Sequence, residues 1–197
     1  MDFLTYLQTV KLRAKPMPSD KQIVHAQIGM LTELGELGDL IKREFAYGKE
    51  FDRINLLEEV GDSFWYLVLY CDEKQIHMGK LDLMRLSAPT SYNGMPESDE
   101  KMLRLLGATI SMLAADELLE LDSYDIVARI EACVMLLYAF LVKYDFTVEQ
   151  CLIANDAKLE KRTGKAYNRE AILNRDTGAE RVILEQHGQT QSGQAPS

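Results

Sequence analysis

Apolar residues along most of this chain recur at helical spacing, and helix-ending residues fall between the apolar stretches. Only five prolines and twelve glycines occur among 197 residues, and long stretches contain neither. Pro16 and Pro18 are expected to end a first helix, and Gly48 a second. We therefore predict an all-α fold of six helices, covering about residues 2–14, 19–47, 52–75, 98–121, 122–145 and 147–162, with a long loop over about 79–96.

Two of these predicted helices carry acidic pairs on faces that are otherwise small or apolar. Glu33 and Glu36 are three residues apart, as are Glu59 and Asp62, so each pair lies on one helical face. The other residues of these two faces are Ala26, Gly29, Met30, Leu37 and Leu40, and Tyr66 and Leu69. Since such faces normally turn toward a core, we expect the four carboxylates to point inward.

Inward carboxylates need a positive partner, because burying an unpaired charge costs several kcal/mol. A single pair of this kind is usually a solvated helix face, but two pairs within about thirty residues favour a shared site. Four carboxylates on two facing helices suit a hard divalent cation. We therefore predict one or two Mg²⁺ ions, or Mn²⁺ as a substitute, held by Glu33, Glu36, Glu59 and Asp62.

The composition limits the classes of partner. A formal net charge of −9 argues against binding to the phosphate backbone of nucleic acid and against docking on an anionic membrane. A nucleotide ligand would need a bridging metal for the same reason. We expect a cytoplasmic protein, because the chain shows no signal peptide or membrane-length apolar run, and its three cysteines suggest reduced thiols.

The chain changes character after about residue 163. From residue 158 to 181, seven basic residues stand against four acidic ones in an otherwise acidic protein. This excess fits either a clamp on an anionic ligand or a solvated helix end. We expect one domain over residues 1–163, a basic extension over 164–187 that packs on the site or on a partner subunit, and a disordered tail over 188–197.

Three motifs in order resemble the MazG-like family of all-α nucleoside triphosphate pyrophosphohydrolases. They are E-x-x-E at Glu33–Glu36, E-x-x-D at Glu59–Asp62, and N-x-x-K-L-x-x-R from Asn155 to Arg162. The run from Glu58 through Trp65 and the tail over residues 167–180 are also similar to family members. The resemblance implies a helical bundle, dimeric or tetrameric, that hydrolyses (deoxy)nucleoside triphosphates to the monophosphate and pyrophosphate with Mg²⁺.

The resemblance also implies roles for particular residues. Lys158 and Arg162 would contact phosphates, Asn155 would bind sugar or phosphate, and Arg175 would belong to the substrate-binding set. Glu58 would support the metal or act as a base, although a solvated glutamate fits this position better. Trp65 and Tyr66 are expected in the core and not against a base.

Two further functions fit the same residues. A dimeric-type dUTPase or dUDPase of the same superfamily would carry similar acidic pairs. A non-catalytic metal-binding or helical interaction module is the alternative from a different class, and it should keep its function after Glu59→Gln.

Overall fold

The structure is a computed structural model that describes residues 1–77 and 98–189. The described residues form helices joined by turns and loops, which confirms the all-α prediction. The helices are α1 (Phe3–Arg13), α2 (Ser19–Tyr47), α3 (Arg53–Glu73), α5 (Asp99–Ala114), α6 (Ser123–Lys143), α7 (Val148–Thr163), α8 (Arg169–Leu173) and α9 (Thr177–Gly188). The predicted loop at 79–96 lies outside the described residues.

Local capping explains where several helices begin and end. The Asp52 side chain accepts hydrogen bonds from two backbone amides at the start of α3. Thr147 and Gln150 cap the start of α7 reciprocally, and Gly48 ends α2 in the left-handed conformation. Pro18 occupies the N-cap position of α2 without a side-chain hydrogen bond, and Ser19 is already helical.

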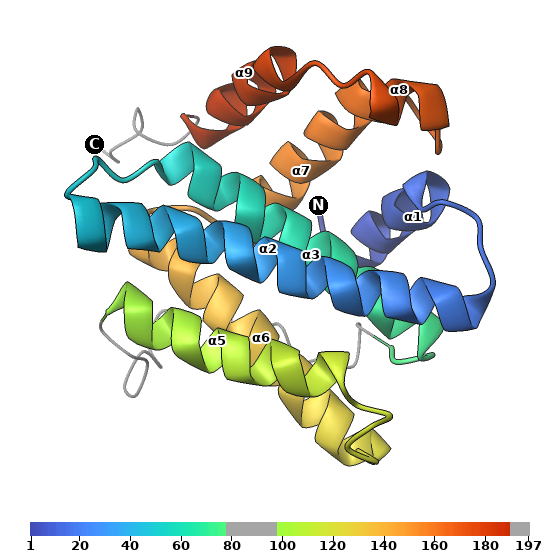
Figure 1. Cartoon of the computed structure of the whole chain (residues 1–197). Coiled ribbons are helices and arrows are strands. Elements are labelled where there is room, and N and C mark those ends of the chain that lie inside the picture. The colour runs from blue at the N-terminus through green and yellow to red at the C-terminus, as the bar shows by residue number, and fades with distance from the viewer. Residues whose placement is uncertain (78–97, 190–197) are drawn as a thin grey trace, which may run out of the picture.

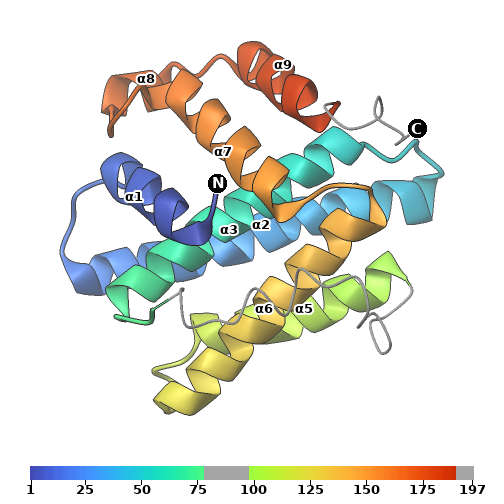
Figure 2. The ribbon, with the colours of Figure 1, turned by 180° about the vertical axis from the view of Figure 1, so that it is seen from behind.

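The helices form three layers, with the α2–α3 pair in the middle (Figure 1). The α5–α6 hairpin packs on one side of this pair, and α1 and α7 pack on the other. The reverse view shows α7 crossing α3 on the side away from α5 (Figure 2). The core runs through the layers and includes Phe64 of α3, Leu106 of α5 and Phe140 of α6, all fully buried.

The predicted basic extension over residues 164–187 contains two helices. It forms α8 and α9, and α9 packs against α7 and the start of α3. Leu184 of α9 is fully buried, and Arg181 donates to both oxygens of Asp52 at 2.9 and 2.8 Å. Gly188 is the last residue of α9 and does not belong to a tail. Its backbone packs so closely on Ile54 that a Cβ would lie 2.4 Å from Ile54 Cδ1. The rest of the predicted tail, 190–197, lies outside the described residues.

The fourth predicted helix ends earlier than expected. α5 stops at Ala114, and residues 115–120 form turns around the buried Asp116. Asp116 accepts hydrogen bonds from Gln27, Tyr70 and the Glu117 amide, and pairs with Lys74 at 2.7 Å. These side-chain partners offer the chain an alternative to the continuing helix. Among the described residues, no helix combines the length and apolar character that crossing a membrane requires.

Candidate functional site

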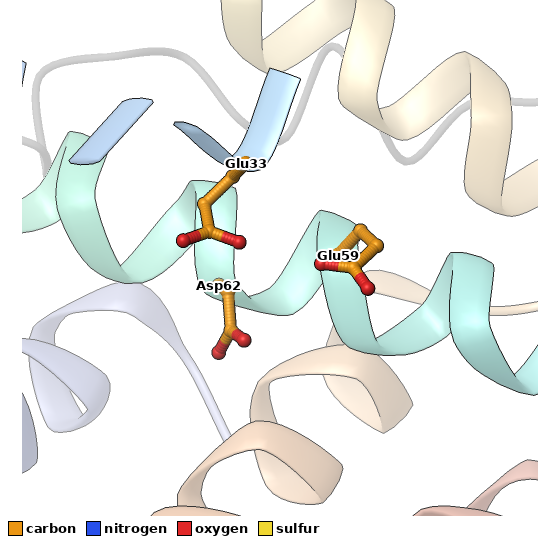
Figure 3. Close-up of side chains that lie close together, drawn as sticks. All are labelled: Glu33, Glu59 and Asp62. Carbon is orange, nitrogen blue, oxygen red and sulfur yellow. The ribbon is translucent and has the colours of Figure 1, made fainter. Parts of the chain in front are cut away.

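Three of the four predicted metal ligands meet between α2 and α3. Glu33 of α2 faces Glu59 and Asp62 of α3, which lie one turn apart (Figure 3). One carboxylate oxygen from each lies within 4.8 Å of the other two. Glu59 is buried and the other two are half-buried. Three oxygen donors at this spacing fit the preference of Mg²⁺ for carboxylate ligands completed by water or phosphate.

Glu36 stands apart from the three-carboxylate cluster. It is exposed on α2. It lines a cavity into which the cluster also opens, but its carboxylate does not belong to the three whose oxygens lie within 4.8 Å of one another. Glu58 also lines this cavity and is half-buried. The structure therefore brings Glu33, Glu59 and Asp62 together and leaves Glu36 and Glu58 at the rim.

Burial makes the cluster reluctant to ionise. Burial raises the pKa of Glu33 to about 7, and the nearby Asp62 carboxylate adds to this rise. Burial, with the charges of Asp62 and Glu58, raises the pKa of Glu59 to about 9. At neutral pH the cluster therefore holds protons that a divalent cation would displace.

Asp62 is held by a set of buried groups from α7 and α1. Lys158 Nζ lies 2.7 and 2.5 Å from its two oxygens, and Asn155 Nδ2 donates to Oδ1 at 2.6 Å. Tyr6 OH in turn donates to Asn155 Oδ1 at 2.5 Å. The position of Asp62 is thus fixed by buried partners, which is how outer residues orient a metal ligand.

Asn155 and Lys158, for which we predicted contacts with sugar or phosphate, belong to this set of buried groups. Both are buried beneath Asp62, and neither lines the cavity. Lys158 is fully buried and also pairs with Glu58 at 3.3 Å. Burial alone would lower the pKa of Lys158, but Asp62 and Glu58 outweigh it and raise that pKa, so the lysine stays charged. Both side chains therefore support the acidic cluster, and a direct contact with phosphate stays a prediction.

One glycine between the acids has a packing reason, and the other has none in the structure. A Cβ at Gly61 would lie 3.0 Å from Asn155 Cβ, so Gly61 lets α7 approach α3 closely enough for Asn155 to reach Asp62. A Cβ at Gly35, in contrast, would meet nothing within 4 Å.

A cavity of about 470 Å³ opens over the cluster. This volume is in the range of small-ligand sites. Its carboxylates come from α2 and α3, whereas its cations come from the α1 end and from α7 and the segment after it. These cations are Arg13, Lys15, Arg162 and Arg175. The cavity therefore offers a cation site and an anion site to one ligand.

The cations of this wall are mostly paired already. Arg162 donates to both oxygens of Glu180, and Arg175 shares that carboxylate. Arg13 pairs with Asp156 and donates to the Gly164 carbonyl. The sequence pointed to Arg162 and Arg175 but missed the other members of this wall, since nothing local marks a residue that only the folded chain brings to a cavity.

Aromatic side chains also line the cavity. Trp65 and Tyr66, which we expected in the core, pack against the core and reach the cavity as well. Both are only half-buried, and they pack edge-to-face at 4.9 Å. Gly29 makes room for Tyr66, because a Cβ there would lie 2.2 Å from the tyrosine ring. His25 completes this side, 5.6 Å from the Tyr66 ring. A planar apolar group could pack against this surface.

No protein-family model, no curated protein and no solved structure matches this chain. The family membership suggested by the three motifs therefore stays a resemblance, and the function has to be argued from the site.

Proposed function

We propose that this protein is a Mg²⁺-dependent hydrolase that converts (deoxy)nucleoside triphosphates to the monophosphate and pyrophosphate. The observation that carries the proposal is one cavity lined both by a three-carboxylate cluster and by three arginines. Phosphoryl transfer is catalysed mainly by positioning and by neutralising charge, and this cavity has groups for both tasks. The half-buried Trp65, Tyr66 and His25 add a surface for the base.

The residues divide into distinct tasks. Glu33, Glu59 and Asp62 would hold the metal, which when bound would polarise phosphate oxygens and lower the pKa of a coordinated water. Lys158 and Asn155 keep Asp62 in place. The guanidinium groups of Arg162 and Arg175 would bind phosphate oxygens.

Two glutamates at the rim, Glu36 and Glu58, are the candidates for accepting a proton from the attacking water. Both line the cavity, and neither belongs to the cluster of three. Glu58 is held by Lys158 at 3.3 Å, whereas Glu36 is exposed and free to move. Separate Gln variants of these two residues would assign the role by the pH dependence of kcat.

Product analysis tests the proposal directly. The protein with Mg²⁺ is incubated with the eight standard NTPs and dNTPs, and with dUTP and dUDP, and monophosphate and pyrophosphate are quantified. We expect equimolar monophosphate and pyrophosphate from one or more triphosphates, lost in Glu59→Gln and kept in Glu131→Gln, an exposed glutamate on α6 away from the cavity.

Other outcomes point to the alternatives. Turnover of dUTP and dUDP alone would favour the dUTPase reading. No turnover of any nucleotide with Mg²⁺ or Mn²⁺ would contradict the enzyme proposal and favour a non-catalytic metal-binding module.

A further inference from the structure

Glu180 is a buried carboxylate that lies behind the cavity wall. It is 2% exposed and is not itself a lining residue. Its Oε1 accepts from Arg162 Nε at 3.0 Å, and its Oε2 accepts from Arg162 Nη2 at 2.7 Å. Arg175 Nη2 donates to the same Oε2 at 2.9 Å. One hidden acid therefore joins two arginines that both line the cavity.

This geometry leaves most of the arginine donors available. A guanidinium has five N–H groups, and Glu180 takes two from Arg162 and one from Arg175. Neither guanidinium donates to any other group among residues 1–77 and 98–189. Two guanidiniums and one carboxylate together also carry a net positive charge. Planar donors fixed in this way suit the oxygens of phosphate groups.

The position of Glu180 is set by the packing of α9 against the rest of the protein. The next turn of α9 carries Leu184, which is fully buried, and Arg181, which holds the carboxylate of Asp52 at the start of α3. Farther along, Gly188 lies against Ile54 without space for a side chain. The packing of α9 therefore fixes the position of Glu180 beside α7. The positions of Arg162 and Arg175 are then set by their hydrogen bonds to Glu180.

We propose that Glu180 is a positioning residue, which holds Arg162 and Arg175 as a paired subsite for the phosphate groups of the ligand. The inference deepens the proposed function and rests on it for the identity of that ligand. The C-terminal extension then completes the anion-binding wall of the cavity. A merely structural Glu180 would tie α9 to α7 and leave ligand affinity unchanged.

Binding of Mg²⁺–tripolyphosphate, measured by calorimetry on the full chain, tests the subsite without requiring turnover. Charge alone predicts that Glu180→Gln binds this anion more tightly, because the wall becomes more positive. Positioning predicts weaker binding, by about tenfold, which is the size expected for misplacing a charged hydrogen bond. Glu185→Gln is the matched control, since Glu185 also lies on α9 and pairs with an arginine, Arg181, which does not line the cavity.

Arg175→Gln keeps the subsite testable if Glu180→Gln unfolds, and a double variant gives a second test of the positioning role if it folds. Arg175→Gln leaves the Arg162–Glu180 pair intact and removes a side chain that is 44% exposed, so it should fold and still weaken binding severalfold. In an Arg162→Gln background, Glu180→Gln should weaken binding much less than in the wild type, because its main partner is gone.

The outcomes separate the subsite from the proposed reaction. Unchanged or tighter binding in folded Glu180→Gln, or undiminished weakening in the Arg162→Gln background, would overturn the positioning role. Weaker binding as expected, with no nucleotide hydrolysed by the wild type, would support the subsite and contradict the proposed hydrolase. Hydrolysis without any effect of Glu180→Gln on binding would do the reverse.

Discussion

Replacing Glu59 by glutamine should stabilise the metal-free protein, and the gain should grow with pH. The pKa of Glu59 rises from its ordinary 4.5 to about 9 in the folded chain, chiefly because of burial. The unfolded chain releases this proton near pH 4.5, whereas the folded chain keeps it. Stability from the protonated form is therefore complete below pH 4.5 and is lost as the pH rises toward 9. Glutamine has nearly the same shape and never has to release a proton.

The size of the effect follows from the same pKa values. Each pH unit between 4.5 and 9 lowers the free energy of unfolding by about 1.4 kcal/mol, so the loss is below about 1 kcal/mol at pH 5. By pH 8 the full linkage would exceed about 4 kcal/mol, and ionisation of the neighbouring Glu33 shares part of it. We therefore expect Glu59→Gln to be more stable than the wild type by about 2 kcal/mol or more at pH 8, and by little at pH 5.

Urea denaturation in EDTA at pH 5 and pH 8 measures both differences. Glu131→Gln, on the exposed face of α6, is the control and should give the same small difference at both pH values. Excess Mg²⁺ should then stabilise the wild type, by about 2.7 kcal/mol at a hundredfold excess over Kd, and should have little effect on Glu59→Gln. A difference between Glu59→Gln and the wild type that does not change with pH would refute the reasoning that burial holds the proton on Glu59.

Three other changes give sharp expectations. Lys158→Met should lower the free energy of unfolding in urea by about 3–5 kcal/mol, because it leaves Asp62 without its buried partner; a loss below 1 kcal/mol would argue against that pairing. Gly61→Ala should push α7 away from α3 and reduce kcat severalfold or more, whereas Gly35→Ala, with open space around it, should raise stability by about 0.5–1 kcal/mol and leave kcat near that of the wild type. Equal effects of the two alanines on kcat would contradict the packing argument. Gly29→Ala should displace the Tyr66 ring and raise KM for nucleotides more than it changes kcat, and an unchanged KM would remove the aromatic surface from the binding site.

The sequence predicted the acidic cluster because helical spacing fixes which side chains share a face. Glu59 and Asp62 lie on one face of α3 and Glu33 turns toward them, as the apolar neighbours indicated. Glu36 lies one turn after Glu33 on α2. That turn places its side chain at the exposed edge of the cavity and outside the cluster. Periodicity gives the face of a helix, but its edge depends on how closely the next helix packs.

The supporting residues could not be read in the same way. Lys158 and a phosphate-binding lysine look identical in sequence, and only the approach of α7 to α3 at Gly61 makes Lys158 a buried partner of Asp62. Glu180 looked like one acid in a basic segment. Its role depends on the packing of α9 against α3 and α7, which links residues far apart in the chain.

The glycines of the C-terminal segment differ in their structural roles. Among Gly164, Gly178 and Gly188, only Gly164 adopts a positive φ, at 74°. The other two lie within α9, where Gly188 serves close packing against Ile54. A glycine can mark a chain break or a tight contact, and the tertiary partner decides which.

The buried ammonium of Lys158 also affects how many divalent cations the three carboxylates of the cluster can balance. When all three carboxylates of the cluster are ionised, they carry three negative charges, and Lys158 cancels one of them from below. The remainder balances a single divalent ion. A second ion would create an excess of positive charge unless an anion arrived with it, so loading of two metals should depend on the concentration of the phosphate ligand. The lysine would in this way make the stoichiometry of the site a function of its occupancy by substrate.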